Sequence, residues 1–164
     1  MKRQVIIGWT LVKVTIVVIL VGWGALYLRT WDPYLGISLP SWTRMPAWIF
    51  LISGGFLVFV SGGILSTRGI TPQSRFLPNE FVAFGPFRYL RNPMSLGVTI
   101  LMFGLALYES SASICLFALT LFLFLHVIVV YMEEPSLERR FGDSYRAYKQ
   151  SVNRWVPRFG DNKS

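Results

Sequence analysis

The chain has 164 residues, of which 53% are apolar and 15% charged, and its sixteen lysines and arginines outnumber its eight acidic residues. This length suits one domain, and the long apolar runs indicate a membrane protein with several spans rather than a soluble globular one. The basic residues lie between and after these runs, so anionic lipid headgroups or an anionic cofactor are better partners than nucleic acid. Because Cys115 is the only cysteine, a disulfide within the chain and a cysteine-based metal site are excluded.

The first apolar run predicts a transmembrane helix over residues 5–28, since about 20 residues are needed for one crossing. Lys13 lies inside this run, close enough to the basic end at Lys2 and Arg3 for its amine to reach the membrane surface; the alternative is a role in binding. The run is long and no Ala-x-Ala site follows it, so we expect a retained helix rather than a cleaved signal peptide.

A second span is predicted over residues 46–66, after an irregular loop (29–45) that is rich in proline and in aromatic residues typical of a membrane interface. Small residues on such a helix let a neighbouring helix approach closely, or provide a flat wall beside a cofactor. The small residues of this span are Gly54, Gly55, Gly62 and Gly63.

A helical hairpin is predicted after a long polar loop over residues 67–92. Residues 93–108 form an apolar helix of about 24 Å, and residues 114–132 return as a fourth span after a tight turn. The two ends of such a hairpin lie at the same membrane face. Residues 92–93 and 133–134 are therefore expected to meet there.

The last segment, residues 133–164, is predicted as a cytosolic amphipathic helix over 135–152 and a polar tail. Apolar side chains recur there every three or four residues with charges elsewhere, as on a helix at a membrane surface. They are Leu137, Phe141, Tyr145 and Tyr148.

The distribution of basic residues predicts the orientation of the four spans. One side holds most of the lysines and arginines, including Arg88 and Arg91, whereas the other side holds only Arg29 and Arg44. Since cytoplasmic loops collect lysine and arginine, both termini and the loop before residue 93 are expected in the cytoplasm. The expected fold class is all-α integral membrane.

The stretch Gly85–Gly97 is the most informative one. It places Arg88, Arg91 and Asn92 directly before an apolar helix, for which Asn92 is a suitable N-cap and Pro93 a suitable first residue. The guanidinium groups and the free N–H groups of the first turn then share one small volume, which attracts a carboxylate or a phosphate. The alternative for the arginines is contact with lipid headgroups.

Further ionisable residues are expected at the same membrane face. Glu133 and Glu134 offer acceptors for ribose hydroxyls, an ammonium or a sulfonium, or else form a solvated helix end neutralised by Arg139 and Arg140. His126 lies seven residues before Glu133, so it either shares the face of that residue or bonds to a neighbouring helix. No Gly-rich phosphate loop, Ser-His-Asp set or metal-ligand spacing is visible, so a chemistry of positioning and electrostatics fits best.

Several short motifs follow one another over the C-terminal two thirds of the chain. They are Gly69-x-Thr71-Pro72, Gly85-Pro86-Phe87-Arg88-Tyr89, Arg91-Asn92-Pro93-Met94-Ser95-Leu96-Gly97, Glu133-Glu134-Pro135-x-Leu137, Phe141-Gly142-x-x-Tyr145-x-x-Tyr148 and Val152-x-Arg154-x-x-Pro157. In order and spacing this set resembles the integral-membrane methyltransferases, the relatives of isoprenylcysteine carboxyl methyltransferase and phospholipid methyltransferase. The chain departs from the family at Asn92, where isoprenylcysteine enzymes usually carry histidine, and at Ser95, where tyrosine is frequent.

The resemblance implies a methyl transfer that uses S-adenosyl-L-methionine and releases S-adenosyl-L-homocysteine. It implies a hydrophobic or lipid acceptor that enters from the bilayer, and a site at the cytoplasmic face of a bacterial inner membrane. No metal is implied. The cofactor pocket would be lined by Tyr89, Arg91, Asn92, Pro93, Gly97, His126, Glu133 and Glu134, while Arg88, Tyr145 and Arg154 would face the acceptor or close over it.

Two other functions stay open at this point. Sterol-type reductases share a related C-terminal architecture, and the phosphates of NADPH would suit Arg88 and Arg91, although the two adjacent glutamates and the short chain favour methyl transfer. The other alternative is a non-enzymatic membrane protein whose loops bind anionic lipid. The sequence leaves open the oligomeric state and the acceptor, which can be an isoprenylcysteine carboxylate, a phospholipid amine, a small thiol or another lipid.

Overall fold

The computed structural model describes residues 19–36, 39–68 and 83–158 of the chain. Within these ranges the chain is all-helical, and one isolated backbone bridge joins Leu90 to Asn153. The predicted all-α class is therefore confirmed. Of the predicted first span, residues 19–28 are described and helical.

Two features of the sequence lie outside the described residues. One is the beginning of the first span, with Lys2, Arg3 and Lys13. The other is the Gly69-x-Thr71-Pro72 motif of the polar loop.

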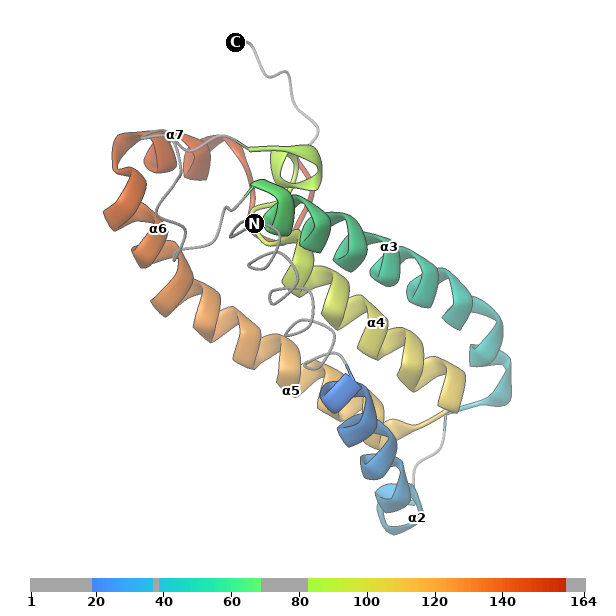
Figure 1. Ribbon diagram of the computed structural model, residues 1–164. Coiled ribbons are helices and arrows are strands. Elements are labelled where there is room, and N and C mark those ends of the chain that lie inside the picture. Colours follow the sequence, from blue (N-terminus) through green and yellow to red (C-terminus); the bar gives the residue numbers. More distant parts are fainter. Residues whose placement is uncertain (1–18, 37–38, 69–82, 159–164) are drawn as a thin grey trace, which may run out of the picture.

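The elements follow one another along the chain as short and long helices. After residues 19–28 they are η1 (Arg29–Trp31), α2 (Asp32–Leu35), η2 (Ser41–Thr43), α3 (Arg44–Arg68), η3 (Gly85–Arg88), α4 (Pro93–Glu109), α5 (Ala112–Ile128), η4 (Val129–Glu133), α6 (Glu134–Phe141) and α7 (Asp143–Ser151). Figure 1 shows α4 between α3 and α5, with α6 and α7 at the opposite end of these helices from α2.

Two helices of the described chain are long and apolar enough to cross a membrane, over Ser41–Leu65 and Ala112–Phe141. The first covers the predicted span 46–66 except for its last residue, and the second contains the predicted span 114–132. The helix between them, α4, is also apolar but has only 17 residues. At 1.5 Å per residue it is shorter than the roughly 30 Å hydrocarbon core. The arrangement of four spans stays a prediction.

Glycines allow α3 and α4 to approach closely. A Cβ atom added to Gly54 would lie 2.7 Å from the backbone nitrogen of Leu101 and 2.8 Å from the carbonyl oxygen of Gly97. The predicted packing role of Gly54 is thus confirmed, and Gly97 contributes to the same contact from α4. A Cβ atom on Gly62 or Gly63 would meet no described atom within 4 Å, so the structure gives these two no such contact.

The predicted hairpin of α4 and α5 is present. Ser110 turns the chain with a φ of 54°, and Ser111 caps α5 by accepting a hydrogen bond from the backbone of Ile114 at 3.2 Å. Apolar side chains hold the two helices and the helix of residues 19–28 together. The buried members of this core are Ala25, Met102, Ala106, Ile114 and Ala118.

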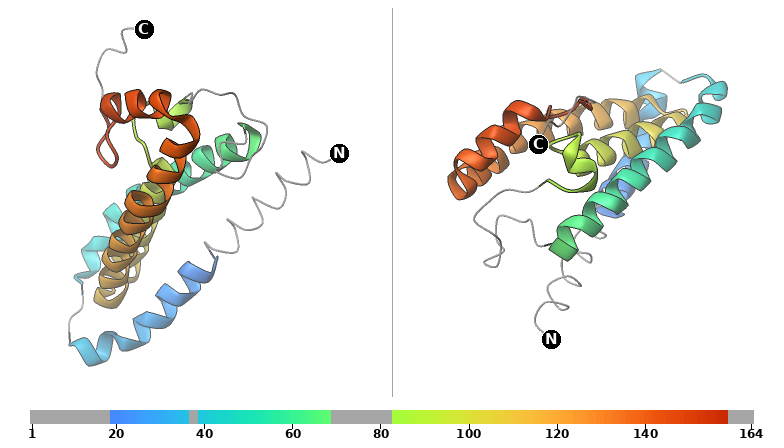
Figure 2. Two further views of the ribbon diagram at one scale, coloured as in Figure 1. Left: turned by 90° about the vertical axis from the view of Figure 1, so that its left-hand side faces the viewer. Right: turned by 90° about the horizontal axis from the view of Figure 1, so that it is seen from above.

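The C-terminal part differs from the single amphipathic helix predicted over 135–152. α6 continues α5 through η4, and Gly142 separates it from α7 (Figure 2). Gly142 has φ 53° and ψ −127°, a conformation that side chains exclude and glycine tolerates. The sequence predicted one uninterrupted helix because the spacing of the apolar residues does not change at Gly142.

The predicted apolar stripe of this region is nevertheless confirmed as a shared core. α7 folds back beside η3, and the hydroxyl of Tyr148 donates to the carbonyl oxygen of Phe87 at 2.6 Å. The result is a small helical cap over the start of α4. Its core consists of Phe141, Tyr145, Tyr148 and Val152, with Leu137 and Ala83 packed against it.

Candidate functional site

A cluster of charged side chains surrounds the carboxylate of Glu134, which is only 4% exposed. Arg154 donates twice to it, from Nε to Oε1 at 2.7 Å and from Nη2 to Oε2 at 3.0 Å. Arg91 donates from Nη1 to Oε1 at 2.9 Å, and Lys149 Nζ lies 3.8 Å from Oε2. One buried carboxylate therefore joins three cations from three separate segments of the chain.

A change in helical winding positions Glu134. The π turn η4 lies directly before this residue, and a π turn contains one residue more than an α-helical turn. It therefore rotates the following residues by about 100° relative to an uninterrupted α-helix. In this register Glu134 is buried while Glu133 is exposed and has no ion pair with a described residue. Of the two adjacent glutamates predicted as site residues, Glu134 is thus buried in the charged cluster and Glu133 is exposed.

The start of α4 supplies the second part of the site. Asn92 stands at the N-cap and Pro93 at the first helical position, as predicted. The Asn92 side chain makes no capping hydrogen bond, however, and its Nδ2 is buried without a partner among the described residues, as is Nε of Arg91. Buried N–H groups are usually paired, because an unpaired one costs about 1–3 kcal/mol. These two donors suit an acceptor from outside the chain.

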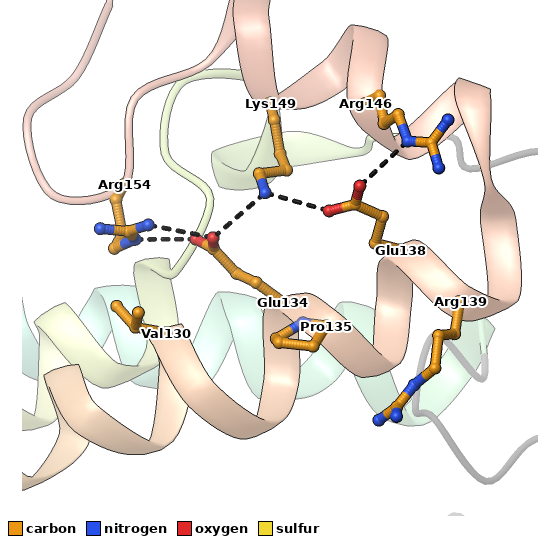
Figure 3. A pocket seen from close by; sticks show the side chains of 8 residues that line it. All are labelled: Val130, Glu134, Pro135, Glu138, Arg139, Arg146, Lys149 and Arg154. Carbon is orange, nitrogen blue, oxygen red and sulfur yellow. Dashed lines mark hydrogen bonds and ion pairs between the residues drawn. The ribbon is translucent and has the colours of Figure 1, made fainter.

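A pocket of about 460 Å³ opens beside Glu134, between α6 and α7 (Figure 3). Lys149 lies there between the carboxylates of Glu134 and Glu138, and its Nζ donates to Oε2 of Glu138 at 3.1 Å. The other oxygen of Glu138, Oε1, accepts from Arg146. Arg139 points away from both carboxylates. The lining therefore carries more positive than negative charge. It consists of Val130, Glu134, Pro135, Glu138, Arg139, Arg146, Lys149 and Arg154.

The chain after α7 returns to the start of α4. The backbone nitrogen of Arg91 donates to the carbonyl oxygen of Asn153 at 2.9 Å, and that of Arg158 donates to the carbonyl oxygen of Tyr89 at 3.2 Å. This segment is called the returning tail below and comprises residues 152–158. It delivers Arg154 to Glu134, which accounts for the position of one predicted site residue.

The returning tail also reaches His126. Trp155 donates from Nε1 to Nδ1 of His126 at 3.0 Å, and its ring meets the Phe122 ring edge-on with centroids 5.2 Å apart. His126 therefore bonds to the tail that carries Arg154. This partner lies in the tail and not on a neighbouring helix, and the predicted contact of His126 with a cofactor stays a prediction.

Two tyrosines pack beside the charged cluster. Tyr145 is 2% exposed and Tyr148 is also buried. Burial raises the pKa of both phenols; the charge of Glu134 adds to this effect for Tyr145. A hydrogen bond to Glu134 raises the pKa of Arg154 as well. Around neutral pH the tyrosines stay neutral and Arg154 stays charged.

Other predicted site residues lie around this cluster. Arg88 and Tyr89 are exposed on and just after η3. Gly97 is buried against α3, where an added Cβ atom would lie 3.0 Å from the backbone nitrogen of Val58. Helix packing accounts for this glycine, and its predicted contact with a cofactor stays a prediction.

Three residues of the cluster were not predicted from the sequence: Glu138, Lys149 and Trp155. The sequence does contain an indication for Trp155, because a large aromatic residue next to Arg154 in a polar tail suggests that the tail packs against the helices. Lys149 comes next to Glu138 only because the chain reverses at Gly142, which the apolar spacing did not reveal. Among the described residues, no group of three His, Cys, Asp or Glu side chains could hold a metal ion.

Comparison with known proteins gives one result. A family model described as phospholipid methyltransferase matches residues 42–144, more than half of the chain. No curated protein and no solved structure gives a match. The matched region contains Arg91 and Glu134 but ends before Lys149 and Arg154.

Proposed function

The chain belongs to the phospholipid methyltransferase family, and from this premise we propose that it transfers the methyl group of S-adenosylmethionine to a lipid or other hydrophobic acceptor. The family supports methyl transfer to lipid at a membrane in general terms. The cofactor, the acceptor and the residues that bind them are our proposal. We also propose that the site faces the cytoplasm, in line with the basic residues around it.

The observation that carries the proposal is the pair of unpartnered donors at the start of α4. Arg91 Nε and Asn92 Nδ2 are buried and lack acceptors among the described residues. The cations of the surrounding cluster outnumber its two carboxylates, Glu134 and Glu138, so it carries a surplus of positive charge. These cations are Arg91, Arg146, Lys149 and Arg154. A ligand carboxylate would pair with the donors and offset this surplus.

The donor set fits the amino-acid end of S-adenosylmethionine, which carries both a carboxylate and positive groups. Arg91 and Asn92 would hold the carboxylate, and exposed Glu133 is available to an ammonium or sulfonium. Tyr89, Pro93, Gly97, His126 and Glu134 complete the proposed lining. Glu134 is also the residue at which this lining adjoins the pocket of about 460 Å³ between α6 and α7, whose other walls come from different residues.

When bound, this cofactor would supply a methyl group on a positively charged sulfur; the acceptor oxygen or nitrogen would bond to the methyl carbon while the carbon–sulfur bond breaks, leaving S-adenosylhomocysteine. The chain contributes orientation and exclusion of water rather than a covalent bond. Arg154 binds Glu134 from the returning tail, and we assign Arg154 and Tyr145 to closing the site over the acceptor. Exposed Arg88 is available to an anionic part of the acceptor.

Binding of S-adenosylhomocysteine to the purified chain in lipid nanodiscs tests the proposal. We expect saturable binding by calorimetry and none of NADPH, which serves as comparator for a reductase. Asn92→Ala is the sharpest variant, because the buried Nδ2 has no partner among the described residues and its removal breaks no hydrogen bond seen there. We expect this variant and Arg91→Ala to weaken binding about tenfold, or 1.4 kcal/mol.

Arg44→Ala is the matched control, since Arg44 is exposed at the far end of α3. It should bind like the unchanged chain. The site assignment would be contradicted if the Asn92→Ala and Arg91→Ala variants bound S-adenosylhomocysteine as tightly as the unchanged chain. Binding of NADPH alone would contradict the proposed function.

A further inference from the structure

The hydrogen bond between Trp155 and His126 determines which ring nitrogen of the histidine carries a proton. An indole N–H can only donate, so Nδ1 of His126, 3.0 Å from Trp155 Nε1, is the acceptor. A neutral imidazole has one N–H group, and it must then lie on Nε2. Nε2 has no partner among the described residues.

Contacts on several sides hold the Trp155 ring in place, so its N–H group stays directed at Nδ1 of His126. It is packed edge-on against Phe122, and its centroid lies 6.0 Å from that of His126. The preceding residue, Arg154, is tied twice to buried Glu134. The neighbouring Asn153 is tied to the backbone of Arg91. The same short stretch of the returning tail thus binds the start of α4, the buried carboxylate and the histidine.

We propose that Trp155 is a positioning residue that holds His126 as the Nε2–H form, so that His126 serves the methyl-transfer site as a hydrogen-bond donor and not as a general base. This inference rests on the proposed function and adds a role to it. The Nε2–H group would donate to an oxygen of the bound cofactor or of the lipid acceptor. A proton released by an amine acceptor must then go to another group or to water.

The first test is spectroscopic and does not depend on activity. His126 is the only histidine of the chain, so labelling with ¹⁵N-histidine gives ring signals from this residue alone. At pH 8 we expect one bare Nδ1 and one protonated Nε2. Trp155→Phe keeps an aromatic ring beside Phe122 but removes the donor, and it should give a mixture of both forms.

Trp48→Phe is the matched control, because the Trp48 ring packs on Tyr108, away from the returning tail. It should leave the histidine spectrum unchanged. A protonated Nδ1 in the unchanged chain, or an unchanged spectrum in the Trp155→Phe variant, would overturn the positioning role.

The second test distinguishes a hydrogen-bond donor from a general base at His126. Glutamine has an N–H donor that reaches about as far as Nε2 but cannot accept a proton, whereas leucine has neither property. We expect His126→Leu to lower kcat/KM for methyl transfer about tenfold, the effect of one hydrogen bond of about 1.4 kcal/mol. His126→Gln should retain most of the activity. Equal loss in both variants would overturn the donor role.

The two proposals fail in different ways. If the unchanged chain neither binds S-adenosylhomocysteine nor transfers a methyl group, the proposed function fails, and the role of His126 fails with it. If the chain is active but its histidine spectrum shows both forms, only the role of Trp155 fails.

Discussion

At the scale of single residues, the buried carboxylate of Glu134 determines how the site is held together. It is bound by Arg91 from the start of α4, by Lys149 from α7 and by Arg154 from the returning tail. Charged groups inside a protein are tolerated when they are paired and hydrogen-bonded, and removal of one partner leaves the others uncompensated. Glu134 is therefore expected to serve both stability and ligand binding.

We expect Glu134→Gln to lower the free energy of unfolding by about 3 kcal/mol, because the shape is kept but the cations lose their negative partner. The change is measured by thermal or denaturant unfolding of the chain in detergent.

Glu138→Gln provides the control for this experiment. Glu138 binds Arg146 and Lys149 in a more exposed position, and exposed ion pairs contribute little to stability. Similar losses in the two variants would mean that burial of Glu134 is not the reason for its effect.

At the scale of elements, the hairpin and the apolar stripe could be predicted because both depend on local patterns. Ser110 and Ser111 form a turn between two apolar runs, and Phe141, Tyr145 and Tyr148 recur at helical spacing. The π turn η4 could not be predicted, since its residues are compatible with an ordinary α-helix. Tertiary contacts of Glu134 with Arg91 and Arg154 accompany this turn, and sequence periodicity does not report them.

The break at Gly142 depends on the backbone freedom of glycine. Gly142→Ala should lower the free energy of unfolding by about 1–3 kcal/mol, because its φ of 53° and ψ of −127° suit only glycine. An added Cβ atom meets no described atom within 4 Å, so the cost comes from the backbone alone. Unfolding experiments in detergent measure it.

Gly62→Ala is the matched control for this prediction. Gly62 lies inside α3, and a new Cβ atom there also meets no described atom within 4 Å, but its backbone is helical. Since alanine is favoured over glycine in a helix by about 0.5–1 kcal/mol, this variant should be as stable as the unchanged chain or more so. A Gly142→Ala variant of equal stability would show that the chain relaxes at this position.

At the scale of the whole molecule, the arrangement in the membrane remains to be tested. Three apolar helices, α3, α4 and α5, lie between exposed Ser41 and exposed Ala147. If each of them crosses the membrane, the two residues lie on opposite sides. The basic residues predict that Ala147 is in the cytoplasm.

The single cysteine allows a direct experiment in a Cys115→Ser background. A membrane-impermeant thiol reagent should label Ser41→Cys in intact cells, and Ala147→Cys only after the cells are permeabilised. The background without an added cysteine should stay unlabelled. Labelling of both positions from the same side would contradict the arrangement with four spans.

The position of Arg154 in the chain has a consequence for how the protein is made. Glu134 lies near the end of the apolar helix Ala112–Phe141, and Arg154, which donates to it twice, follows 20 residues later. The carboxylate therefore leaves the ribosome before Arg154 does, and during synthesis Arg91 is the partner already available. A chain interrupted after α7 would contain every apolar helix described here but no finished site.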